Sequence, residues 1–306
     1  MDKEKIINPK IQTFGHGLLM GIADSVPGVS GGTIALIIGI YQKLITSLTI
    51  FINFFKNGCP SRSYNTFISS LYFLMPLGFG IILSYYVVTK ILVGPDESPG
   101  FLRQSSTAPY VYAFFFGLVL ISIREPWNSI SSPSFKNYFL LFLGALLIYI
   151  YTIFPSSYSD NNLILVIGGA LALTAMLLPG ISGALVLLAL GQYTRIANSV
   201  HNLDIEPLVF FLFGGLIGLI TFVPLMNFFL NNYKEYTLSV LAGLMLGSLI
   251  TLWPWKYTYN GDGLSPNLGF REILDNFEVL ELALTFIIFI LGMSSSYVLK
   301  HYLSDN

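Results

Sequence analysis

The stretch Asp24-Ser25-Val26-Pro27-Gly28-Val29-Ser30-Gly31-Gly32-Thr33 interrupts an apolar run near the start of the chain. It combines an acid, three hydroxyl side chains, three glycines and a proline. Proline removes a backbone donor and clashes with the preceding helical turn, and glycines weaken a helix further. A second stretch of the same kind, Leu177-Leu178-Pro179-Gly180-Ile181-Ser182-Gly183-Ala184, lies in the second half of the chain. The sequence therefore predicts two breaks within otherwise apolar segments.

The composition around these breaks is that of a membrane protein. Of 306 residues, 54% are hydrophobic and 10% are charged, whereas about a quarter of a soluble domain is charged. Several runs reach the roughly 17 to 25 apolar residues needed to cross a bilayer, and they are apolar on all sides, unlike barrel strands. The sequence thus predicts an all-α polytopic membrane protein forming one integral membrane domain, 1–306. A broken backbone at membrane depth needs cover from protein or a water-filled cavity.

Several functional classes find no support in the sequence. A net charge of -1 suggests no nucleic-acid partner, and the single cysteine, Cys59, excludes an internal disulfide and a cysteine-based metal cage. The chain has three dispersed histidines and none of the common hydrolase, zinc-protease or phosphate-loop motifs. We therefore expect no enzyme activity, no cofactor and no metal site. The oligomeric state stays open.

The apolar runs divide into short legs and long spans. Legs at 14–23 and 33–41 flank the first break, and each of about ten residues is only about 15 Å long as a helix. This pattern favours a re-entrant hairpin over one spanning helix with an unwound middle. The second break is flanked likewise by legs at 163–176 and 185–193. Six full-length runs complete the prediction of six spanning helices plus two re-entrant hairpins, at 68–92, 109–124, 137–154, 208–230, 237–253 and 277–298.

The two breaks belong to an internal duplication with an offset of 152 residues. This offset aligns Pro27 with Pro179, Gly28 with Gly180, Ser30 with Ser182, Gly31 with Gly183, Gly39 with Gly191, Tyr41 with Tyr193 and Lys43 with Arg195. We place repeat one at about 14–154 and repeat two at about 163–300. Each repeat has three crossings, an odd number, so the second must be inverted. With both termini in the cytoplasm, ten Lys and Arg residues fall inside and five outside, as the positive-inside rule expects. Inverted repeats with broken elements are common in secondary transporters.

The breaks offer chemistry suited to an anion. Ser30 and Ser182 each precede a second leg, where serine is a good N-cap and a helix start presents free N–H groups and partial positive charge. Two such starts could converge on one phosphate or carboxylate. The alternative is that they only form turns and allow close packing. Candidate binding residues are Ser25, Ser30, Gly31, Gly32, Thr33, Ser182 and Gly183.

Asp24 breaks the repeat, because its counterpart is Met176. A carboxylate at membrane depth costs several kcal/mol unless it is paired, protonated or solvated. Three interpretations remain open: it caps loop amides, it carries a proton or cation that couples or gates transport, or it pairs with a basic side chain. Lys43 and Arg195 lie about a dozen residues beyond the breaks, roughly 18 Å along a helix. They either attract lipid headgroups or act as ordinary interfacial anchors.

The residues Gly21-Ile22-Ala23-Asp24-Ser25-Val26-Pro27-Gly28-Val29-Ser30-Gly31-Gly32-Thr33, followed by Gly39-Ile40-Tyr41, resemble the bacterial polyprenyl-phosphate transporter family of the PopT type. Met176 to Gly183, with Gly191 and Tyr193, is similar to that family's second repeat. The resemblance implies a bacterial inner-membrane protein that returns undecaprenyl phosphate to the cytoplasmic leaflet for cell-wall synthesis. Where many members are expected to carry serine, this chain has Ala184, so a contact there would use the backbone.

The resemblance thus implies a translocase for a polyprenyl-phosphate lipid within the bilayer. The residues alone indicate a transporter of a small or amphipathic anion. The alternatives are a carrier or channel for a small soluble anion and a membrane enzyme acting on lipid phosphates.

Overall fold

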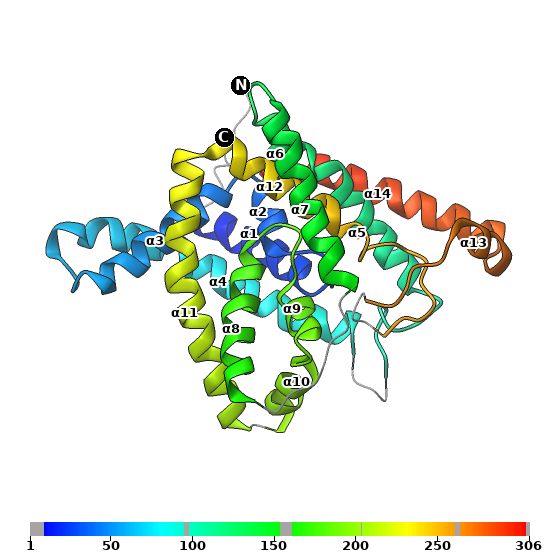
Figure 1. Cartoon of the computed structure of the whole chain (residues 1–306), viewed down its shortest axis with the longest axis horizontal. Coiled ribbons are helices and arrows are strands. Elements are labelled where there is room, and N and C mark those ends of the chain that lie inside the picture. Colours follow the sequence, from blue (N-terminus) through cyan, green and yellow to red (C-terminus); the bar gives the residue numbers. More distant parts are fainter. Residues whose placement is uncertain (1–8, 95–97, 154–160, 203, 261–263, 304–306) are drawn as a thin grey trace.

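The computed structural model describes residues 9–94, 98–153, 161–202, 204–260 and 264–303. Throughout these ranges the chain is helical and contains no β-strand, in agreement with the predicted all-α class (Figure 1). The first half contains α1 (Pro9–Asp24), α2 (Gly31–Ile37), α3 (Tyr41–Lys56), η1 (Ser61–Ser63), α4 (Tyr64–Leu92), α5 (Ala108–Ser122), α6 (Arg124–Asn128) and α7 (Phe135–Ile153). The second half contains α8 (Asn162–Leu177), α9 (Gly183–Ala189), α10 (Tyr193–Asn202), α11 (Ile205–Asn232), α12 (Lys234–Ser248), α13 (Phe270–Asn276) and α14 (Val279–Leu303).

Four stretches are long and apolar enough to cross a membrane: α4, α5 continued through α6, α11 and α14. This agrees with four of the six predicted spans. The run at 137–154 forms α7, whose apolar part is shorter, and the run at 237–253 forms α12, which has only 15 residues. Helix α12 ends at Ser248, and residues 249–252 form turns before Pro254. The structure therefore does not show the full-length span predicted at 237–253, because α12 is too short.

The helices pack in four close pairs: α1 with α4, α8 with α11, α5 with α14, and α7 with α12. The first two pairs lie within one half of the chain each, and the other two join the halves. Glycines permit the close approach. A Cβ atom at Gly17 would lie 2.2 Å from the Leu77 carbonyl oxygen, and one at Gly169, its counterpart 152 residues later, would lie 1.9 Å from that of Phe211. The two halves therefore build the same kind of helix contact.

Contacts at the helix termini define two ends of the bundle. At what we name the α6 end, Lys300 forms an ion pair with Glu125 at 2.6 Å, and Glu235 accepts the N–H of Ser131. At the α13 end, Arg103 and Ser105 line one cavity together with Tyr257 and Glu272, and the Tyr112 and Tyr259 rings lie 6.3 Å apart. The ends of α14 and α11 and the starts of α7 and α12 lie at the α6 end, and the end of α4 and start of α5 lie at the α13 end (Figure 1). Helices α4 and α11 consequently run in opposite directions.

The directions of α1 and α8 follow from their partners. In α1 and α4, Gly17 meets Leu77 and Gly21 meets Ile81, so the helices are parallel. In α8 and α11, Val166 meets Gly214 and Ala170 meets Gly218, so these are parallel too. Helix α1 therefore enters the bundle from the α6 end and α8 from the opposite side, where α10 lies (Figure 1).

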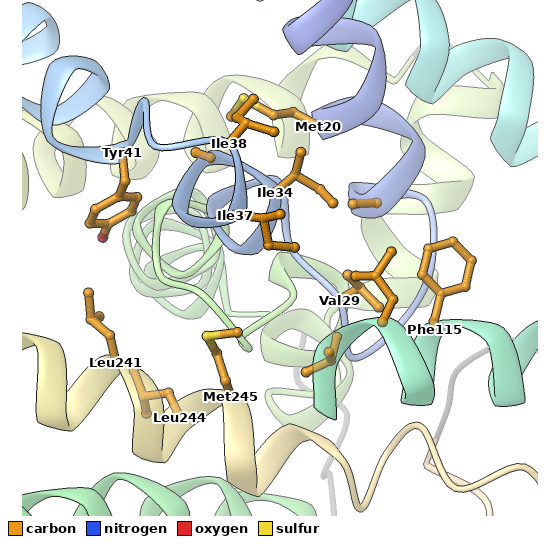
Figure 2. Packing of buried hydrophobic residues seen from close by; sticks show 14 of the residues in the cluster. Met20, Val29, Ile34, Ile37, Ile38, Tyr41, Phe115, Leu241, Leu244 and Met245 are labelled. Atoms are coloured by element: carbon orange, nitrogen blue, oxygen red, sulfur yellow. The ribbon is translucent and has the colours of Figure 1, made fainter. Parts of the chain in front are cut away.

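The main core lies around α2. Ile34 and Ile37 from α2 pack among Met20, Val29, Phe115 and the α12 residues Leu241, Leu244 and Met245 (Figure 2). All of these side chains are at most 7% exposed. The polar loop before α2 is therefore held inside the bundle and not on its surface.

Candidate functional site

The two Pro-Gly stretches form loops that separate short helices. The first loop, 25–30, joins α1 to α2, and the second, 178–182, joins α8 to α9. Gly28 and Gly180 adopt positive φ angles of 91° and 82°, which L side chains rarely tolerate. Beyond α2 and α9, Gly39 and Gly191 do the same, at 79° and 64°. Both glycine pairs are separated by 152 residues, so the offset found in the sequence also relates backbone conformation.

The two loops are joined directly by hydrogen bonds. The Ser30 hydroxyl donates to the Leu178 carbonyl oxygen at 2.8 Å, and the Gly180 N–H donates to the Thr33 hydroxyl at 3.1 Å. Gly32 lies so close to the second loop that a Cβ atom there would be 2.6 Å from the Leu177 carbonyl oxygen. Because these partners are buried or part-buried, each bond forms with little competition from solvent. The loops, 148 residues apart in sequence, therefore form one polar contact inside the bundle, which we name the loop junction.

Asp24 ends α1 beside this junction. Its Oδ1 atom accepts the N–H of Gly31 at 2.6 Å, and Oδ2 lies where a Cβ atom on Gly31 would be 2.6 Å away. None of the ion pairs among the described residues involves Asp24. The carboxylate thus occupies the first N–H group of α2, one of the donors that sequence reasoning expected to be available to an anion. A capping contact is present, and it leaves the coupling role open to test.

The second repeat differs at the equivalent place. Where Asp24 lies against Gly31, Met176 lies against Gly183, with its Sδ atom 3.2 Å from a Cβ atom placed there. A thioether is a weak acceptor, so Met176 does not compete for a backbone N–H as a carboxylate does. Ser30 accepts the Thr33 N–H at 3.3 Å as an N-cap, whereas Ser182 makes no side-chain cap hydrogen bond. The first loop therefore has more of its donors engaged than the second.

The remaining predicted residues have different surroundings. The Ser25 hydroxyl donates to the Ile22 carbonyl oxygen at 2.6 Å, within its own helix turn. Ser182 and Gly183 are buried and Ala184 is half-buried at the start of α9. The first loop meets the second through Leu178 and Gly180 instead. Sequence reasoning did not select these two residues, although the Pro179-Gly180 turn marked the position.

The two basic candidates lie away from the loop junction. Lys43, in α3, is exposed and its Nζ atom lies 4.7 Å from the Phe73 ring centroid. Arg195, in α10, donates to the Asn162 side chain at 2.6 Å, near the start of α8. Neither of these two contacts involves a residue of the loops 25–30 and 178–182.

An apolar cavity of about 570 Å³ reaches the loop junction from the direction of the α6 end. Leu178 and Ile181 of the second loop line its inner part, and Tyr233 and Tyr236, at the turn between α11 and α12, line its outer part. The remaining lining is apolar except for Thr237. The loop junction is therefore connected with a surface suited to hydrocarbon.

A bundle of apolar helices with paired polar loops at its centre defines a helical membrane transport protein. The comparisons with known proteins agree with this class. The undecaprenyl phosphate translocase-like family matches residues 20–263, which contain both loops. The chain belongs to this family.

Two relatives are each named polyprenyl-phosphate transporter. The Vibrio cholerae protein is 36% identical over 252 residues, covering 81% of this chain and 79% of that protein. The Staphylococcus aureus protein is 29% identical over 258 residues, covering 78% of this chain and 84% of that protein. No solved structure matches the chain. The family and both relatives are transporters and not enzymes, as the sequence predicted.

Proposed function

We propose that this chain moves a polyprenyl phosphate between the leaflets of the bacterial cytoplasmic membrane, with the phosphate passing the loop junction and the tail remaining in an apolar environment. The observation that carries the proposal is the pair of hydrogen bonds, Ser30 to Leu178 and Gly180 to Thr33, inside a bundle of this family. The names of the two relatives support the choice of lipid. Undecaprenyl phosphate is the substrate that the family's description favours.

The proposal includes two inverted repeats, about 14–154 and 163–300, each with a re-entrant hairpin. Three observations support it: α1 and α8 enter from opposite ends, the helix pairs correspond between halves, and the positive-φ glycines repeat at the same offset. A re-entrant hairpin is also favoured by the depth of the first loop. Gly21, just before it, contacts Ser84 of α4, eight residues or about 12 Å before the end of that long helix.

The phosphate would compete with protein acceptors for the donors of the loop junction. The Ser30 hydroxyl and the Gly180 N–H now donate to Leu178 and Thr33. A phosphate oxygen is a stronger acceptor than a carbonyl or hydroxyl oxygen, because it is charged. Ser25, Gly31, Gly32, Ser182, Gly183 and Ala184 complete the proposed binding set through hydroxyl or backbone groups. Phosphate binding would then weaken the contact between the two hairpins. A hairpin that moves during transport requires this weakening.

Asp24 would couple this step to a proton or cation. An ionised Asp24 holds the Gly31 N–H and repels a phosphate nearby. Protonation or cation binding removes the repulsion and weakens the acceptor, so the Gly31 N–H becomes available to the phosphate. Lys43 and Arg195 would attract headgroups at the two membrane surfaces. In this arrangement the α6 end, and the chain termini that lie outside the described residues, face the cytoplasm.

The test uses the full chain in vesicles that contain a labelled polyprenyl phosphate. Movement of intact lipid phosphate from one leaflet to the other supports the proposal. Uptake of soluble anions without lipid movement would favour a small-anion carrier or channel, and release of inorganic phosphate would indicate an enzyme. The double variant S30A/S182A tests the site, because weaker binding of the lipid phosphate is expected and unaltered affinity would reduce both serines to caps.

A further inference from the structure

A second cavity, of about 830 Å³, lies between the C-terminal half of α4 and the end of α8. Its lining includes Ile81, Tyr85, Tyr86, Thr89 and Lys90 from α4 and Met176 from α8. Lys90 and Val93 belong to the last turn of α4 and its C-cap, so this cavity opens toward the α13 end. It therefore lies on the opposite side of the loop junction from the apolar cavity described above.

Its outer part carries a cation with a hydroxyl partner. The exposed Lys90 Nζ atom donates to the Tyr86 hydroxyl at 2.6 Å and lies 4.3 Å from the centroid of the same ring. A lysine ammonium has three N–H donors, so this bond leaves capacity for an anion. The end of a membrane-crossing helix is also the level of lipid headgroups.

The inner part of the cavity leads toward Asp24. Tyr85 lies five residues, about 7.5 Å along the helix, deeper than Lys90. Ile81, another turn deeper, has its carbonyl oxygen 2.3 Å from a Cβ atom placed on Gly21, so the floor of the cavity adjoins the end of α1. Met176 lies against Gly183 at the start of α9. From Lys90 to Ile81 the path is nine residues, or about 14 Å along the helix.

The order of side chains along this path suits one kind of ligand. A cation lies outermost and tyrosine and threonine hydroxyls follow, while Ile81 and Met176 supply apolar surface. The innermost residue, Ile81, adjoins the end of α1 beside the loop junction. The cavity at the α6 end, in contrast, is lined by apolar, tyrosine and threonine side chains. The molecule therefore presents a cation to an entering anion at the α13 end.

We propose that the cavity beside α4 receives the phosphate group of the lipid from the leaflet at the α13 end, with Lys90 as its first contact and Tyr85 as the next. The ligand class is a phosphate monoester carried on a hydrocarbon chain. This inference rests on the proposed function, since it names the route by which the same substrate reaches the loop junction.

The test compares the two leaflets in vesicles with a known protein orientation. Cys59 is the chain's single cysteine, is exposed, and lies between α3 and η1, so a membrane-impermeant thiol reagent reports the orientation. Initial rates are then measured for labelled polyprenyl phosphate added to either leaflet. The variants are K90Q, K90R and, as a matched control, R271Q, which removes an exposed cation of α13 at the same end outside the cavity.

For entry from the α13 end, we expect K90Q to raise the half-saturating lipid concentration about five-fold, the effect of losing one exposed ion pair. Entry from the α6 end should be unchanged, K90R should restore the wild-type value, and R271Q should match wild type. If K90Q behaves as wild type from both leaflets while the wild type moves lipid, this assignment is wrong and the proposed function stands. If the wild type moves no lipid, the proposed function itself fails. Uptake of inorganic phosphate that K90Q reduces would overturn the lipid assignment of the cavity.

Discussion

Replacing Ser30 by alanine should destabilise the fold far more than the same change at Ser182, its counterpart in the repeat. One hydroxyl at position 30 serves two contacts. It donates to the Leu178 carbonyl oxygen at 2.8 Å and accepts the Thr33 N–H at 3.3 Å. Ser182 occupies the same place before α9 but makes no side-chain cap hydrogen bond. Comparing the two variants therefore separates the loss of these two contacts from the general effect of removing a buried serine hydroxyl.

The expected magnitude follows from these two contacts. Loss of a serine N-cap costs about 1 kcal/mol. Loss of one neutral hydrogen bond costs about 1 kcal/mol more, because the part-buried Leu178 carbonyl loses its partner. S30A should therefore lower the free energy of unfolding by about 2 kcal/mol. For S182A, which loses no cap contact, we expect a change under about 0.5 kcal/mol.

The assay is equilibrium unfolding of the full chain in one detergent, followed by the loss of helical circular dichroism, with wild type, S30A and S182A measured side by side. The quantity compared is the difference in unfolding free energy between the two variants, since shared effects of the detergent cancel. Equal values for S30A and S182A would refute the loop junction as a stabilising contact. A larger loss in S182A would show that the second loop, and not the first, supplies the contact.

Four further variants test three neighbouring features. In D24N the side-chain amide oxygen can still accept the Gly31 N–H, so we expect normal assembly but a loss of pH-dependent or cation-dependent transport; unchanged dependence would rule out coupling. G17A should destabilise the chain by about 1–3 kcal/mol, because its Cβ atom would lie 2.2 Å from the Leu77 carbonyl oxygen. G15A in the same helix meets nothing within 4 Å and should stabilise by about 1 kcal/mol, and similar thermal unfolding of the two variants would contradict the close packing of α1 on α4. Tyr41 is 2% exposed and its hydroxyl has no hydrogen-bond partner in the described part of the chain, so Y41F should raise stability by about 1 kcal/mol; a lower melting temperature would show that the hydroxyl is bonded.

The sequence predicted the helices better than their contacts. Long apolar runs gave α4, α11 and α14 to within a few residues, because a membrane-crossing segment has a composition that few other structures share. The Pro-Gly pairs located both loops for the steric reasons that make those residues rare inside helices. The second legs were predicted to end at 41 and 193, two residues beyond the breaks at Gly39 and Gly191, since one glycine in an apolar helical run is also tolerated in a membrane helix.

The loop junction could not be derived from one sequence. The expectation that two loops converge followed from the inverted repeat, but the partners of Ser30 and Thr33 are a backbone carbonyl and a backbone N–H. Every residue has a carbonyl and nearly every residue an N–H, so side-chain identity carries no signal for them. The cavity beside α4 could not be predicted either, because the sequence around Tyr85 and Lys90 identifies only a membrane-spanning helix. Their roles depend on which helix packs beside them.

The coupling that we propose depends on a difference between the two halves of the chain. In the proposed inverted repeat, two identical halves would make the two faces of the protein energetically equivalent. Asp24 and Met176 occupy equivalent places against Gly31 and Gly183, yet only Asp24 can hold a proton or a cation. A change in its charge alters the first loop and leaves the second as it was. Because the loops are bonded to each other, the proposed change in the charge of Asp24 would act on one side of the loop junction, and the coupling that we propose requires this difference between the halves.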